Sequence, residues 1–208
     1  MKCSGIGKRD TVSCADAQIC PPACMCTDTI VDCRDRGLAH IPSNLPGSTS
    51  ELRLEQNQIT FIPSKAFHNM GGLKRLVLYG NNLTDLPIEA FHGLENLQLL
   101  LLNANQLQCI RRGTFDPLTK LNLLSLYDNQ IKSISNATFH KLPKLQTLHL
   151  ARNPLICDCN MVRSFSRFLK KNIGKSFNKV TYLKKWLAEL QEARGIETVE
   201  RGVNCQGG

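Results

Sequence analysis

The sequence lacks the hydrophobic segments that would export the chain or hold it in a membrane. Its N-terminus, MKCSGIGKRDTVSC, has no apolar stretch of the kind found in secretory signal peptides. No apolar run approaches the ~18 residues that a transmembrane helix needs. We therefore expect no membrane insertion.

Catalytic and cofactor motifs are also missing. The chain has no Gly-rich phosphate loop, and no nucleophile, base and orienting residue form a plausible set. Three histidines, His68, His92 and His140, each follow a phenylalanine at regular spacing, which favours solvated loop positions over a metal or catalytic role. We expect no enzymatic activity, no cofactor and no metal site.

Acidic residues are absent from residues 160–185, although the whole chain has a net charge of +9. A run of cations without acids can attract sulfated glycosaminoglycans such as heparan sulfate. The alternative is a solvated insertion without a ligand. Nucleic acid is disfavoured as the partner, because the cysteine content of the chain predicts an extracellular protein. The cations that form this heparin-binding candidate are Arg163, Arg167, Lys170, Lys171, Lys175, Lys179, Lys184 and Lys185.

Cysteine, by contrast, is abundant, with 10 residues among 208. Disulfides persist in oxidising compartments, so this content predicts a secreted, extracellular protein. A disulfide-bonded protein without an export signal indicates a fragment of a longer chain. We interpret residues 1–16 as the tail of a preceding domain or a linker.

A repeat of 24 residues organises the middle of the chain. In the segment LQLLLLNAN, Leu97, Leu100 and Leu102 followed by an asparagine fit the template L-x-x-L-x-L-x-x-N. Five segments carry this template, and their asparagines are Asn57, Asn81, Asn105, Asn129 and Asn153. The pattern is that of leucine-rich repeats. We predict a leucine-rich repeat solenoid of the α/β horseshoe type, with five repeats over residues 49–153 and a short parallel β-sheet on its concave face.

A second apolar column is predicted toward the convex side. Phenylalanines recur in the return path of four repeats with the same spacing as the asparagines. Stacked turns would bring them together in the core. They are Phe67, Phe91, Phe115 and Phe139.

A cysteine-rich segment, residues 17–48, precedes the repeats and is predicted to cap the open end of the leucine column. Its four cysteines, at positions 20, 24, 26 and 33, allow three pairings. Cys24 and Cys26 are one residue apart and cannot easily bond each other, which removes one pairing. Of the remaining two we choose Cys20–Cys26 with Cys24–Cys33, and a zinc site is the alternative.

Residues between the inward leucines point outward, because side chains alternate along a strand. By this register an apolar patch with a charged rim lies exposed on the concave face, which is typical of a protein interface. The alternatives are that another segment covers the patch or that the register is locally wrong. Glu51, Glu55, Gln56 and Thr147 are placed on the same face. The predicted binding residues are Arg53, Arg75, Val77, Tyr79, Leu99, Leu101, Asn103, Leu123, Ser125, Tyr127, Asp128, His149 and Arg152.

Several segments closely resemble the second leucine-rich repeat domain of the Slit family of secreted axon-guidance ligands. They are CPPACMCTDTIVDCR, ELRLEQNQI, LVLYGNNL, LQLLLLNANQLQCI, LNLLSLYDNQI and NPLICDCN. The resemblance implies a concave face that binds the first immunoglobulin domain of Roundabout receptors in axon guidance and cell migration, with heparan sulfate as co-ligand. The positions that match the receptor contacts by motif are Arg53, Tyr79, Leu99, Leu101, Tyr127 and His149.

The sequence departs from the Slit pattern in three ways. One repeat is missing between LRLEQN and LVLYGN, and a basic insertion, residues 161–182, separates CDCN from the expected amphipathic capping helix around Trp186. The C-terminal cap, residues 154–208, keeps three of the four cysteines that such caps carry. We pair Cys157 with Cys205, which leaves Cys159 unmatched.

Two Asn-x-Thr sequons predict glycosylation, at Asn82 and Asn136. For the whole chain, the predicted function is that of a secreted Slit-like ligand or a fragment of one. The alternative is another extracellular leucine-rich repeat adhesion or matrix protein with a different partner.

We expect deletion of residues 161–182 to lower the salt concentration at which the chain elutes from immobilised heparin, because the deletion removes six of the eight cations. A variant with a Gly/Ser linker of equal length in their place controls for the change in chain length. Unchanged elution would show that the segment is a solvated insertion.

Overall fold

The computed structural model describes residues 20–134 and 138–155. Several predictions fall outside these residues: the N-terminal tail, the Cys157–Cys205 pair, the capping helix around Trp186, the cations from Arg163 to Lys185, and the sequon at Asn136. The Slit-like C-terminal cap therefore stays a prediction.

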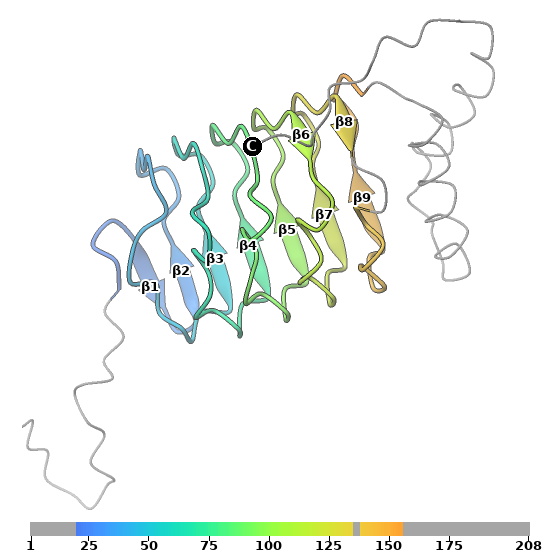
Figure 1. Ribbon diagram of the computed structural model, residues 1–208. Helices are drawn as coiled ribbons and strands as arrows, with labels where there is room; N and C mark the ends of the chain where they lie inside the picture. The colour runs from blue at the N-terminus through green and yellow to red at the C-terminus, as the bar shows by residue number, and fades with distance from the viewer. Residues whose placement is uncertain (1–19, 135–137, 156–208) are drawn as a thin grey trace, which may run out of the picture.

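Seven short strands lie side by side in one sheet that runs the length of the described solenoid (Figure 1). The first two strands pair antiparallel, and every later pair is parallel. In sheet order they are β1 (Met25–Thr27), β2 (Ile30–Asp32), β3 (Glu51–Arg53), β4 (Arg75–Val77), β5 (Leu99–Leu101), β7 (Leu123–Ser125) and β9 (Thr147–His149). The predicted short parallel sheet of a leucine-rich repeat solenoid is confirmed.

The register of the sheet follows the repeat without a shift. Leu52 pairs with Leu76, Leu76 with Leu100, and Leu100 with Leu124, so each template leucine stacks on its equivalent one turn away. These four side chains have no solvent exposure. Strand alternation places the flanking residues on the opposite, outer side of the sheet.

The return path of each turn contains no helix in the described part of the chain, so the helices expected for an α/β horseshoe are not found there. Successive tight turns replace them, as in the hydrogen bonds from the amide of Ala66 to the carbonyl of Pro63 and from Met70 to Phe67. A period of 24 residues leaves too few in the return path for a helix of ordinary length. Instead, β6 (Cys109–Ile110) and β8 (Ser133–Ile134) form a second, two-stranded parallel sheet, seen above β5 and β7 in Figure 1.

The predicted phenylalanine column is present in the core. Phe91 stacks on Phe115 with ring centroids 5.8 Å apart, and Phe115 stacks on Phe139 at 6.1 Å. Phe67 is fully buried one turn before Phe91. Two apolar columns, of leucine and of phenylalanine, therefore fill the solenoid from its two sides.

The repeat asparagines bind each turn to the turn before it. Asn105 Nδ2 donates to the carbonyl of Leu78 in the preceding turn at 3.0 Å and to that of Leu102 in its own turn at 3.1 Å. Its Oδ1 accepts the amide N–H of Leu83 at 3.0 Å. Asn81 makes the equivalent bonds to Leu54 and Ile59. These side chains satisfy buried backbone groups that lie beyond the short strands.

The N-terminal cap extends the sheet by one hairpin. Disulfides join Cys20 to Cys26 and Cys24 to Cys33, the pairing chosen from the sequence over zinc coordination. Strand β2 pairs with β3, and the amide of Cys33 donates to the carbonyl of Arg53. The first repeat strand therefore has no open edge, which protects it from pairing with another chain.

We expect Asn105→Ala to lower the free energy of unfolding by at least about 3 kcal/mol, because it leaves several buried backbone groups without partners. Urea denaturation measures the loss. Gln106→Ala, a change at the exposed neighbouring position, is the matched control and should cost little. A loss below about 1 kcal/mol for Asn105→Ala would contradict a structural role for the ladder.

Candidate functional site

The outer surface of the sheet carries the predicted binding residues in rows that cross the strands. One row contains Arg75, Leu99 and Leu123, which are paired across β4, β5 and β7. A second row contains Val77 and Leu101, paired across β4 and β5, with Ser125 and His149 on the next two strands. The geometry brings these residues together on one face, as the repeat register predicts.

A third row lies just after the strands, where Tyr79 and Tyr127 flank Asn103. Backbone hydrogen bonds continue the parallel pairing here: Gly80 donates to the carbonyl of Asn103, and Ala104 donates to that of Tyr127. Both tyrosines and Asn103 are half-buried. At an inter-strand spacing of ~4.8 Å, the tyrosines lie about 10 Å apart, two turns from each other.

In every repeat the backbone turns away from this face at the same position, at a residue with a left-handed backbone conformation (positive φ). The five residues have φ angles between 52° and 67° and are Gln56, Gly80, Ala104, Asp128 and Arg152. A left-handed residue turns the chain away from the strand direction, and it is uncommon in residues other than glycine. This turn ends the face and aims Asp128 and Arg152 at its edge, where both are exposed.

The apolar centre of the face is less exposed than the sequence register suggested. Val77, Leu99, Leu101 and Leu123 are half-buried rather than fully exposed. Ser125, predicted to face out, is only 5% exposed. Neighbouring strands lie close together, so long side chains cover part of each other and cover a short serine almost completely. We call Val77, Tyr79, Leu99, Leu101, Leu123 and Tyr127 the apolar centre.

The N-terminal end of the face is a network of charges. Arg53 Nε bonds Glu51 Oε1 at 2.6 Å, and Arg75 Nη1 approaches Glu51 Oε2 at 3.3 Å. In the pair of Arg75 and Glu51 the arginine lies further out, because the side chain of Arg75 is 61% exposed and that of Glu51 is 13% exposed. This end of the face therefore presents guanidinium groups to a partner, with carboxylates beneath them.

Two residues of this network come from the cap and were not recognised in the sequence. Arg34 Nη2 bonds Asp32 Oδ2 at 2.8 Å, and Arg34 Nε lies 3.6 Å from Glu55 Oε1. The cap strand β2 aligns Asp32 with Arg53, a separation of 21 residues rather than 24. The repeat template does not cover the cap, so its spacing could not reveal that Asp32 and Arg34 continue the face.

Glu55 was expected to face out but is buried beside Arg34. Its side chain is 9% exposed, and within the described residues Glu55 Oε2 has no hydrogen-bond partner. Burial raises the pKa of Glu55, and the positive charge of Arg34 opposes that rise. Burial also acts to raise the pKa of Glu51, but the hydrogen bond from Arg53 and the charges of Arg53 and Arg75 outweigh it, so the pKa of Glu51 is lowered.

The opposite end of the face carries a different set of groups. The guanidinium of Arg152 lies over the ring of Tyr127, 5.4 Å from its centroid. His149 at the end of β9 is exposed. A cation over an aromatic ring stabilises both side chains in place, so this end offers a pre-arranged aromatic and cationic surface.

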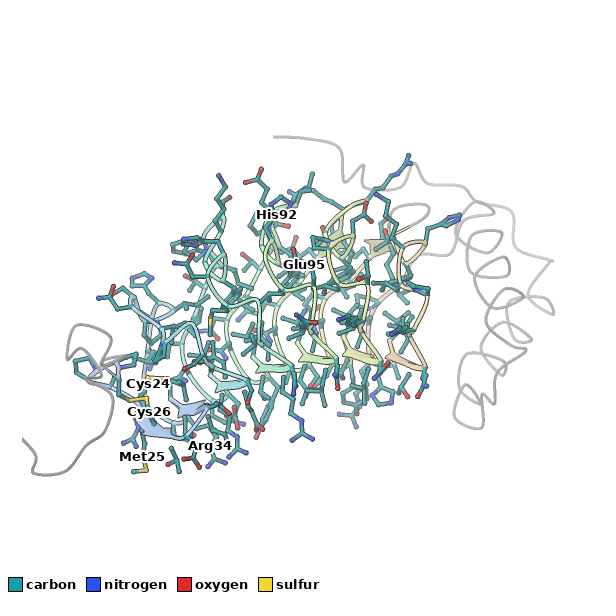
Figure 2. The ribbon with its side chains drawn as sticks, turned by 90° about the horizontal axis from the view of Figure 1, so that it is seen from below. Cys24, Met25, Cys26, Arg34, His92 and Glu95 are labelled. Carbon is teal, nitrogen blue, oxygen red and sulfur yellow. A yellow bond between two sulfur atoms is a disulfide. The ribbon has the colours of Figure 1, made fainter. Side chains whose placement is uncertain are left out.

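His92, one of the histidines that follow a phenylalanine, lies away from this face (Figure 2). Figure 2 shows His92 and Glu95 on the side opposite the sheet, while Met25 and Arg34 lie by the first strands. Within residues 20–134 and 138–155, no group of three or more His, Cys, Asp or Glu residues could hold a metal. In the same part of the chain, no helix has the length and apolarity that crossing a bilayer requires.

A capped stack of in-register leucine and asparagine turns defines a leucine-rich repeat module. Comparison with known families agrees. Residues 48–107 and 96–155 match the leucine rich repeat model, and residues 19–46 match the leucine rich repeat N-terminal domain. These matches span more than half of the chain, which belongs to the leucine-rich repeat family.

Individual relatives share parts of this architecture. The chain is 43% identical over 63 residues to leucine-rich repeat-containing protein 3 of Danio rerio. This aligned stretch covers 28% of this chain and 24% of that protein. It is 39% identical over 80 residues to biglycan of Xenopus laevis, covering 36% of this chain and 22% of biglycan. The chain thus spans less than a quarter of the length of these relatives.

A solved octameric complex of latrophilin 3, Unc5D and the leucine-rich repeat domain of FLRT2 contains a chain with a similar fold. The TM-score is 0.56 with 31% sequence identity, over 65% of this chain and 42% of that chain. A similar repeat fold therefore occurs in a multi-protein assembly.

We expect the stability of Glu55→Gln to improve relative to the wild type as pH rises from about 4 to 7. The raised pKa of Glu55 means that its stabilising, protonated form is lost as pH rises through the folded-state pKa, whereas glutamine stays neutral. Urea denaturation at several pH values measures the difference.

Glu51→Gln is the matched control with the opposite sign. The lowered pKa of Glu51 means that its contribution is present at neutral pH and is lost as pH falls through the folded-state pKa. This variant should be less stable than the wild type at neutral pH and approach it in acid. If the stabilities of the two variants relative to the wild type changed with pH in the same direction, the opposite pKa shifts of Glu55 and Glu51 would be contradicted.

Proposed function

We propose that this chain is an extracellular protein-binding module whose concave face binds the first immunoglobulin domain of a Roundabout-type receptor. In this role it is a Slit-like ligand, or a fragment of one, that acts in axon guidance and cell migration. The observation that carries the proposal is the apolar centre, in which Leu99 and Leu101 lie between charged ends of the same face.

The composition of the face supports a protein partner rather than a small ligand. Protein interfaces combine an apolar, aromatic centre with a polar rim. Here half-buried leucines and two tyrosines form the centre, and Arg53, Arg75 and Arg152 stand at its ends. Tyrosine and arginine are among the residue types that most often dominate binding energy at interfaces.

The positions carried over from the Slit resemblance fall on this one surface. Tyr79, Leu101 and His149 lie on consecutive or alternate turns of the sheet. Strand β3 pairs directly with β4, so the repeat that the chain lacks relative to Slit leaves no gap in the sheet. A β-domain lying across the sheet can therefore contact the charged end and the apolar centre together.

The disulfide-bonded cap supports an extracellular location, because such bonds persist in oxidising compartments. Heparan sulfate remains the proposed co-ligand through the basic segment from Arg163 to Lys185. That part of the proposal rests on sequence alone, and its test is the heparin elution described above.

The alternative function is that of another extracellular repeat protein that uses the same face for a different partner. The likeness to the repeat domain of FLRT2, solved together with latrophilin 3 and Unc5D, favours this candidate. It predicts a folded protein that does not bind Roundabout but is still sensitive, toward its own partner, to changes in the apolar centre.

We expect Leu101→Arg and Tyr79→Ala each to weaken binding to the first Roundabout immunoglobulin domain by at least about 30-fold, because each removes a central contact. Surface plasmon resonance measures the affinity. The melting temperature should stay nearly unchanged, since both side chains lie on the outer side of the sheet.

Ile88→Arg provides the matched control, because Ile88 is 52% exposed and lies outside the binding face. This variant should bind as the wild type does. A large fall in melting temperature for Leu101→Arg would mean that the leucine belongs to the core. A folded wild-type chain that does not bind Roundabout would favour the alternative partner.

A further inference from the structure

We propose that Asn82 carries an N-linked oligosaccharide and that the sugar covers one flank of the solenoid while the concave face stays open. The sequon Asn82-Leu83-Thr84 follows directly after the ladder residue Asn81. Asn82 and Thr84 are both exposed, and Leu83 between them is fully buried. The two residues that define the sequon therefore point to the same, solvated side.

Backbone hydrogen bonds hold this segment in an extended path. The amide of Asn82 donates to the carbonyl of Ile59 in the preceding turn at 2.9 Å, and the amide of Leu83 donates to Asn105 Oδ1 at 3.0 Å. These bonds involve the backbone of the sequon and leave the amide group of the Asn82 side chain pointing away from the core. A sugar on Asn82 Nδ2 therefore disturbs no hydrogen bond of the ladder.

The surroundings of Asn82 form a polar strip that runs along the flank. In the turn before Asn82 and the two turns after it, the residues at the equivalent position are Gln58, Gln106 and Gln130, and all three are exposed. The positions equivalent to Thr84 are Thr60, Gln108 and Lys132, also exposed. We call these eight residues the flank strip. Over these four turns the flank strip contains no apolar residue, so it lacks the features of a protein interface and tolerates a bulky hydrophilic group.

The flank strip and the concave face are separated by the asparagine ladder. Asn81 turns its side chain inward to the carbonyls of Leu54 and Leu78, and the chain passes from the sheet to the flank at this residue. A sugar at Asn82 therefore extends from the side of the solenoid. It restricts a partner to an approach along the sheet, where the apolar centre lies.

The chemistry requires an oligosaccharide donor linked to a lipid diphosphate. The nitrogen of the Asn82 side-chain amide attacks C1 of the first sugar and loses a proton. A C–N bond forms, the bond between C1 and the diphosphate oxygen breaks, and the lipid diphosphate leaves. Transfer occurs on the chain as it enters the secretory pathway, so this inference rests on the export that the proposed function requires.

The test is secretion of the chain from human cells behind a cleavable leader, followed by site-specific mass spectrometry. Removal of N-linked sugar by peptide N-glycosidase in heavy-oxygen water converts a modified asparagine into a labelled aspartate. We expect most of the peptide that contains position 82 to carry the label. Recovery of this peptide mainly as unlabelled asparagine from secreted, disulfide-bonded protein would overturn the proposal.

Three variants separate the sequon from the fold. Asn82→Gln and Thr84→Ala should each remove the sugar, and Thr84→Ser should keep it. Asn82→Gln should leave the fold intact, because glutamine occupies the equivalent position in three other turns. Persistence of the label on the peptide that contains Asn82 in Thr84→Ala would show that the label does not depend on the sequon and would overturn the assignment to Asn82.

Receptor binding distinguishes this inference from the proposed function. The glycosylated wild type and Asn82→Gln should bind the Roundabout immunoglobulin domain with affinities within about twofold of each other. Tighter binding by Asn82→Gln, by ~10-fold or more, would show that the sugar obstructs the face and overturn the flank placement. A labelled Asn82 in a protein that binds no Roundabout domain would overturn the receptor proposal and leave the glycosylation standing.

Discussion

The side-chain amides of the repeat asparagines hold each turn of this protein to the turn before it, and the rest of the structure depends on that contact. The strands are only three residues long, so they pair few backbone groups, and the asparagines satisfy the groups beyond them. A single amide reaches carbonyls of two turns and an amide N–H of one. Because the bonds recur every turn, the leucine and phenylalanine columns stay in register from cap to last repeat.

Within each short strand, the side chains alternate between the core and the outer surface of the sheet. In β5, Leu100 belongs to the core, while Leu99 and Leu101 stand on the outer side, paired with their counterparts on the neighbouring strands. The same leucine-rich segment can therefore support the solenoid and offer an apolar surface. The proposed binding residues lie on the face where parallel pairing places equivalent side chains of successive turns next to each other.

The cap shapes that face as well as closing the core. Its hairpin aligns Asp32 and Arg34 with the first repeat and creates a network with Glu51, Arg53 and Glu55. Carboxylates lie beneath and arginines lie outside, so the charge presented to a partner is mainly positive at this end. Two disulfides fix the hairpin that carries these groups, and they therefore hold this charged end of the face in place together with the fold.

The sequence by itself determined the period, the solenoid and which leucines turn inward, because these follow from spacing and from the alternation of a strand. For the cap cysteines it removed one of three pairings, and the structure shows which of the remaining two is present. The sequence also placed Tyr79, Leu101 and Tyr127 on a common face. Only the tertiary structure decided how far such residues are exposed: Ser125 and Glu55 are buried because neighbouring turns cover them. The register of the cap, which differs from that of the repeats, and the replacement of helices by tight turns depend on long-range packing that no local pattern records.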